Sequence, residues 1–139
     1  MLNLDTKIVK NFVIRIFFAN FAGKITIKML KFISFGSGSS GNSYYLYTET
    51  DSLLIDVGVG IRTLKKHFHN YGLRFEDVHH VLITHDHADH VKSVGSLSTD
   101  YHLPVYATRK VHAGIERNYC VRKKIVPNHA HIIEKGVPF

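Results

Sequence analysis

The chain has 139 residues, enough for one domain or part of one. Its 45% hydrophobic content is typical of a soluble globular core, and its net charge of +7 favours anionic partners, nucleic acid among them. The single cysteine, Cys120, excludes an internal disulfide and fits a reducing, cytoplasmic compartment. Any bound metal would therefore be held by histidine and carboxylate.

Residues 1–28 differ in composition from the rest of the chain. They are basic and rich in phenylalanine, and Arg15 and Asn20 interrupt the apolar run. This makes the run too short and too polar to cross a membrane. We interpret residues 1–28 as an N-terminal extension outside a domain that spans residues 29–139. A secretory signal with a basic start is the less favoured alternative.

Hydrophobic patterning predicts an alternation of strands and helices along this domain. β-branched and aromatic runs predict strands at 31–35, 44–48, 52–56, 80–84, 104–107 and 129–133. Apolar residues at helical spacing predict helices over 61–71, over 91–97, and from a cap at Thr108 toward Asn118. The fold class is therefore mixed α/β.

Residues 36–41, GSGSSG, match the dinucleotide fingerprint G-x-G-x-x-G. That fingerprint functions only when a helix follows it and binds the pyrophosphate, and here a predicted hairpin follows. We interpret the segment as a flexible turn. The alternative is a loop whose N–H groups line a pocket for an anionic substrate, with Ser39, Gly41, Asn42 and Ser43 as its candidate residues.

The segment LITHDHADHV contains an unusual concentration of metal-ligand residue types. His85 and His87 are one residue apart and can face one ion, because alternate residues of an extended segment share a side. Asp89 and His90 follow where the chain turns into a helix, and can face a second ion. Asp86 alternates away from this pair. Two ions in such a site can clamp both the attacking and the leaving oxygen of a hydrolysis.

The histidines allow two other interpretations. The segment from His85 to His90 could be a surface loop that binds metal by accident, but its H-x-H-x-D-H register after an apolar strand argues against this. His129 and His131 form a second H-x-H. We interpret them as alternating residues on one face of an edge strand rather than as further ligands.

H-x-H-x-D-H after an apolar strand is the signature of the metallo-β-lactamase superfamily. LLIDVG, with Asp56 at a strand end, resembles that superfamily's first motif. MLKFISFGSGSSGNSYYLY, followed by LLIDVGVG and VLITHDHADHVKSVGSL, resembles the YycJ-like (WalJ-like) hydrolases, regarded as DNA exonucleases. The resemblance covers about residues 29–139.

The resemblance implies an αββα sandwich, of which this chain would supply the first half. It implies that His85 and His87 bind a first divalent ion and that Asp89 and His90 bind a second, most simply Zn²⁺, with Mn²⁺ or Fe²⁺ as alternatives. Asp56 would support the site from behind the ligands. Asp89 would also orient or deprotonate the attacking water.

The family completes its site with a further histidine for each metal and a bridging aspartate, and none of these is matched before Phe139. We therefore expect this chain to be weakly active or inactive. The leading function is a metal-dependent phosphodiesterase or exonuclease acting on DNA, with no membrane partner. A basic later segment supports it: Arg109, Lys110, Arg117, Arg122, Lys123 and Lys124. The alternatives are a thioester or lactone hydrolase and a non-catalytic gene fragment.

Overall fold

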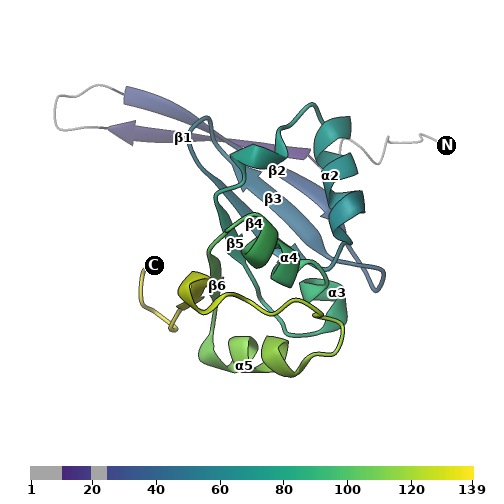
Figure 1. Ribbon diagram of the computed structural model, residues 1–139. Coiled ribbons are helices and arrows are strands. Elements are labelled where there is room, and N and C mark those ends of the chain that lie inside the picture. Colours follow the sequence, from purple (N-terminus) through teal and green to yellow (C-terminus); the bar gives the residue numbers. More distant parts are fainter. Residues whose placement is uncertain (1–10, 20–24) are drawn as a thin grey trace.

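The computed structural model describes the backbone of residues 11–19 and 25–139, and the side chains from Met29 onward. The strands are β1 (Asn11–Ala19), β2 (Ile25–Gly36), β3 (Ser43–Tyr47), β4 (Ser52–Val57), β5 (His80–Leu82), β6 (Val105–Ala107) and β7 (Ala130–Ile132). The helices are α2 (Ile61–Asn70), α3 (Ala88–Val91), α4 (Val94–Asp100) and α5 (Arg109–Arg117), with short 3₁₀ turns at η1 (Phe75–Asp77) and η2 (Pro127–His129). Mixed α/β, as predicted, is therefore the observed class (Figure 1).

All the strands belong to one sheet, in the order β1-β2-β3-β4-β5-β6-β7. Strands β1 to β4 pair antiparallel, and β4 to β7 pair parallel. Strands β4, β5 and β6 therefore end at the same edge of the sheet. In sheets of this kind, ligands bind beyond the carboxyl ends of parallel strands, so this edge is where the candidate site should lie.

One face of the sheet forms the core. Leu54, Val81 and Val105 are register neighbours on β4, β5 and β6, and all three are fully buried. Helices α2 and α4 lie together on one side of the sheet (Figure 1). Leu64 and Leu97 from these two helices belong to the same buried cluster. Burying such side chains stabilises the fold by about 1.5–3 kcal/mol each.

The opposite face of the sheet is also apolar, but it is only partly covered. Leu46, Leu53, Ile55 and Leu82 alternate with the core residues along β3, β4 and β5 and are half-buried. This pattern follows from the period of two residues along a strand.

Two predicted elements differ from the structure. The predicted helix over 91–97 is two helices, α3 and α4, separated at Ser93. The Ser93 hydroxyl donates to the carbonyl of Val59 at 2.6 Å, and its N–H donates to the carbonyl of Val57 at 2.9 Å. These bonds hold the break against the end of β4, which places the start of α3 beside the sheet edge.

His129 is the second difference, because the interpretation of His129 and His131 as alternating residues of one strand is wrong for His129. It lies in the turn η2, before β7, and its Nδ1 is 2.9 Å from the carbonyl oxygen of Ser98. His131 does lie in β7, where its ring stacks on Tyr106 with 4.9 Å between centroids. Each ring therefore has a local structural partner.

The N-terminal segment contributes backbone to the sheet. Strand β1 pairs with β2 from Asn11 opposite Ile33 to Ala19 opposite Ile25. The domain boundary at Met29 stays a prediction, and residues 1–10 and 20–24 of the predicted extension lie outside the described residues. In the described part of the chain, no helix is long and apolar enough to span a membrane.

Candidate metal centre

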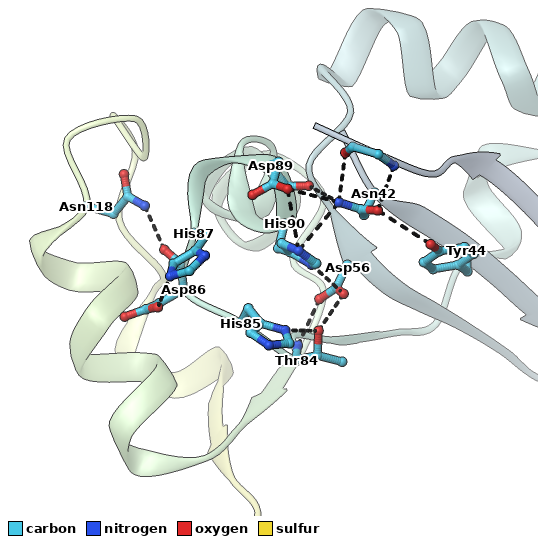
Figure 2. A network of polar contacts seen from close by, with 11 residues as sticks. Asn42, Tyr44, Asp56, Thr84, His85, Asp86, His87, Asp89, His90 and Asn118 are labelled. Atoms are coloured by element: carbon cyan, nitrogen blue, oxygen red, sulfur yellow. Dashed lines mark hydrogen bonds and ion pairs between the residues drawn. The ribbon is translucent and has the colours of Figure 1, made fainter. Parts of the chain in front are cut away.

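The predicted ligand segment occupies the sheet edge where β5 ends. Ile83, the residue after β5, is buried, and its N–H donates to the carbonyl of Tyr106 at 2.9 Å, which fixes where the chain leaves the sheet. His85 and His87 are exposed, whereas Asp89 and His90 are half-buried at the start of α3. The segment thus presents its histidines and aspartates along one strand-to-helix connection (Figure 2).

Asp56 lies behind this segment, at a bulge in β4. Ser43 pairs with Val57 and Tyr44 with Ile55, which leaves Asp56 as the extra residue, with φ of 57°. A left-handed residue at a bulge re-aims its side chain. The carboxylate of Asp56, only 3% exposed, is consequently turned toward the ligand segment.

Three groups bind the Asp56 carboxylate: two from Thr84, just before the ligand segment of His85 to His90, and one from His90 itself. The N–H of Thr84 donates to Oδ1 at 2.8 Å, the Thr84 hydroxyl donates to Oδ2, and Nδ1 of His90 lies 2.8 Å from Oδ2. A histidine whose Nδ1 is held by a carboxylate has its tautomer and ring orientation fixed, with Nε2 left for a ligand. Nε2 of His90 faces Oδ2 of Asp89 at 3.6 Å.

Asn42, from the Gly/Ser loop, contacts the ligand segment from the other side. Its backbone N–H donates to the carbonyl of Asp89 at 2.7 Å, and its Nδ2 donates to Asp89 Oδ2 at 3.1 Å. Nδ2 also lies 3.4 Å from Nε2 of His90. Figure 2 shows this amide reaching toward both side chains. The sequence predicted Asn42 as a candidate residue of a substrate loop, and the structure places it against Asp89.

Glycines allow the backbones of the Gly/Ser loop, the end of β4 and the start of α3 to approach one another closely. A Cβ on Gly58 would overlap the carbonyl oxygen of Asp89, and a Cβ on Gly41 would lie 2.7 Å from the carbonyl oxygen of Gly58. Gly41 also has φ of +144°, which side chains rarely adopt. Ser43, in contrast, is fully buried in β3, and its hydroxyl has no hydrogen-bond partner among the described residues.

The histidine rings lie near one another without closing on a single point. The centroids of His85 and His90 are 4.9 Å apart, and those of His85 and His87 are 6.1 Å apart. Asp86 lies against Gly114 of α5, and its Oδ1 is 4.0 Å from Nε2 of His87. Within the described residues, no group of three His, Cys, Asp or Glu side chains converges in a way that would hold a metal ion.

The donor set nevertheless fits a divalent metal. Imidazole nitrogen and carboxylate oxygen are the ligands that Zn²⁺ and similar ions take when thiolates are absent. The bond from His90 to Asp56 is the outer contact that metal-binding histidines usually have. The described residues therefore place four side chains of ligand type, His85, His87, Asp89 and His90, along one strand-to-helix connection.

A cavity of about 660 Å³ opens beside Asp89. Its lining includes Ser39 from the Gly/Ser loop, Lys92 after α3, and Arg122 from the loop that follows α5. The sequence singled out Ser39 and Arg122 but not Lys92. No local pattern marks Lys92, because only the fold brings these three segments together.

This fold and this cluster agree with the match to known families. The beta-lactamase superfamily domain matches residues 52–139, and the chain belongs to that superfamily. The mixed α/β fold and the resemblance to its YycJ-like branch, both expected from the motifs, are confirmed.

Particular relatives make the comparison more specific. Exodeoxyribonuclease YycJ of Bacillus anthracis is 39% identical over 87 residues, which are 63% of this chain and 33% of that protein. Exodeoxyribonuclease WalJ of Streptococcus pneumoniae is 35% identical over 106 residues, which are 76% of this chain and 39% of that protein. The chain thus spans about two fifths or less of the length of these curated relatives.

Solved structures show the same fold. A beta-lactamase from Chitinophaga pinensis has a TM-score of 0.52 at 26% identity, with 60% of this chain and 31% of that chain covered. The metallo-beta-lactamase SMB-1 has a TM-score of 0.59 at 13% identity, with 78% of this chain and 45% of that chain covered.

Proposed function

We propose that this domain belongs to a metal-dependent hydrolase that cleaves phosphodiester bonds of DNA as an exonuclease. The observation that carries the proposal is the Asp56–His90 bond of 2.8 Å, which orients a ligand-type histidine toward Asp89. The names of the relatives, exodeoxyribonuclease YycJ and WalJ, support DNA as the substrate.

In this proposal His85 and His87 hold one divalent ion, and Asp89 and His90 hold a second. Bound divalent ions supply an acidified water and charge stabilisation at the phosphate. Zinc suits the imidazole and carboxylate donors, and manganese or ferrous iron suits them as well. Asp56 keeps His90 in one tautomer through the bond to Nδ1.

Asp89 is the proposed catalytic residue. Its carboxylate is half-buried and lines the cavity, so it can accept a proton from an attacking water or orient that water. The amide of Asn42 donates to Oδ2 of Asp89 at 3.1 Å. That bond engages Oδ2, and Oδ1 has no hydrogen-bond partner among the described residues, so Oδ1 is open to the water.

The experiment compares substrates and variants under identical metal loading. We expect metal-dependent release of nucleotides from end-labelled DNA, at a low rate, that is lost in His87→Ala and Asp89→Ala. His69→Ala, which changes an exposed histidine of α2, is the matched control and should behave as the wild-type chain.

The same assay separates the alternatives. Faster hydrolysis of a thioester or lactone than of DNA would replace the proposal with a small-molecule hydrolase of the same fold. Metal binding with no turnover on any of these substrates would support a non-catalytic chain.

A further inference from the structure

Thr84 lies between the end of β5 and the predicted ligand segment, and it is bonded to Asp56 twice. Its N–H donates to Oδ1 of Asp56 at 2.8 Å, and its hydroxyl donates to Oδ2. One residue therefore directs both of its donors at the two oxygens of one buried carboxylate. These two bonds fix the direction of the Thr84 hydroxyl.

The same hydroxyl has a second neighbour in the ligand segment. Its oxygen lies 3.0 Å from Nδ1 of His85 (Figure 2). A hydroxyl has one proton to donate, and a hydrogen bond to a charged carboxylate is about twice as strong as one to a neutral acceptor. The proton therefore goes to Asp56, and the hydroxyl oxygen accepts a hydrogen bond from His85. His85 is consequently held in the tautomer that carries its proton on Nδ1.

His90 reaches the same oxygen of Asp56 directly. Its Nδ1 lies 2.8 Å from Oδ2, and its ring centroid lies 4.9 Å from that of His85. Oδ2 of Asp56 thus orients one histidine from each of the two proposed ligand pairs, His90 directly and His85 through Thr84. In both rings a proton on Nδ1 leaves the lone pair of Nε2 for a metal ion.

His87 provides a contrast within the same segment. Its Nε2 lies 4.0 Å from Oδ1 of Asp86, and its side chain is 75% exposed. In the described part of the chain, the bonds of Thr84 and Asp56 reach His85 and His90 but not His87. The tautomer of His87 should therefore not depend on Thr84, which makes His87 an internal reference.

We propose that Thr84 is a positioning residue of the metal centre, whose hydroxyl connects the Asp56 carboxylate to His85 and so fixes the tautomer of His85. The proposal rests on the proposed function and deepens it, because it adds a residue that acts on the first ion through its ligand. It requires the hydroxyl of Thr84 and not the methyl group. Serine should therefore replace threonine without loss, and valine, which is of similar size, should not.

Nuclear magnetic resonance of the metal-free chain tests the tautomer without metal or catalysis. Long-range proton–nitrogen correlation spectra of the histidine rings distinguish a proton on Nδ1 from one on Nε2, in EDTA at about pH 8, where imidazole is neutral. His85→Ala identifies the His85 signals by their loss. We expect a protonated Nδ1 on His85 in the wild-type chain and in Thr84→Ser, and a mixture of both tautomers in Thr84→Val.

Titration with Zn²⁺ measures the consequence for the metal centre. Thr84→Val should weaken binding about tenfold, as for other groups behind metal-binding histidines, and Thr84→Ser should bind as the wild-type chain does. Thr63→Val is the matched control, because it removes an exposed hydroxyl from α2. It should leave both the His85 tautomer and the zinc affinity unchanged.

A protonated Nε2 on His85 in the wild-type chain would overturn the proposal, and this measurement needs no variant that might fail to fold. An unchanged tautomer in Thr84→Val would overturn it as well. Equal changes at His87 and His85, or a Thr84→Ser spectrum like that of Thr84→Val, would show a structural role of Thr84 instead. Failure of metal binding or DNA hydrolysis in the wild-type chain would contradict the proposed function and leave the tautomer result intact.

Discussion

The Nδ1 atom of His90 lies 2.8 Å from Oδ2 of Asp56, so the last residue of the ligand segment is bonded to the end of β4. Asp56 also accepts a hydrogen bond from the N–H of Thr84, the residue immediately before the segment. One carboxylate therefore binds both ends of the segment from His85 to His90. This relationship supports the proposal that Asp56 positions the cluster through Thr84 and His90.

Replacing Asp56 tests that role. Asp56→Ala leaves the Thr84 N–H and His90 Nδ1 without their partner in a site that is 3% exposed, so we expect a loss of about 3 kcal/mol in the free energy of unfolding. Metal affinity should fall about 10- to 100-fold, as for other carboxylates behind metal-binding histidines. Urea unfolding and metal titration would measure the two effects.

Asp51→Asn is the control for Asp56→Ala, because Asp51 is an exposed carboxylate that contacts His79 and His80 away from the cluster. Its effect on metal affinity should be negligible. Equal metal affinity in Asp56→Ala and the wild-type chain would contradict the positioning role.

The Asn42 amide gives a second prediction. Asn42→Ala removes the bond to Asp89 Oδ2 at 3.1 Å and the bond from the Gly38 N–H at 3.0 Å, so Asp89 loses one of its fixed contacts. We expect about tenfold weaker metal binding, measured by competition with a chelator. Tyr44→Phe removes only a 3.5 Å contact to Oδ1 of Asn42 and should change little. Similar losses in both variants would contradict a specific role of the amide toward Asp89.

The glycines of the Gly/Ser loop give a third prediction. Gly41→Ala introduces a Cβ 2.7 Å from the carbonyl oxygen of Gly58 at φ of +144°, so we expect a loss of about 1–3 kcal/mol in stability. Gly38→Ala, at φ of +136° but with open space around it, should cost less, because it lacks the overlap. Thermal unfolding of both variants would compare them. A larger loss in Gly38→Ala would show that the contact with Gly58 does not matter.

Local sequence patterns predicted most of the fold and the composition of the cluster. Ile61, Leu64 and Phe68 follow a helical period, and α2 begins at Ile61 and ends before Gly72 as that period requires. Thr108 was expected to cap α5, and its hydroxyl accepts the N–H of Val111. These features depend on neighbours within a few residues.

Features that depend on distant contacts could not be predicted in the same way. The break between α3 and α4 follows from the bonds of Ser93 to Val57 and Val59, which are far from it in sequence. The contact of Asn42 with Asp89 joins residues 47 positions apart. The cavity likewise depends on the fold, because its lining joins Ser39, Lys92 and Tyr119 from three separate segments.

Metal binding by the cluster is the central claim, and titration with Zn²⁺ or Co²⁺ tests it most directly. In the proposed assignment each ion has two protein ligands, where catalytic zinc usually has about three, so we expect affinity in the micromolar rather than the nanomolar range. Binding should be lost in His87→Ala and Asp89→Ala and retained in His69→Ala. Wild-type affinity in both His87→Ala and Asp89→Ala would contradict the assignment of this segment as the metal centre.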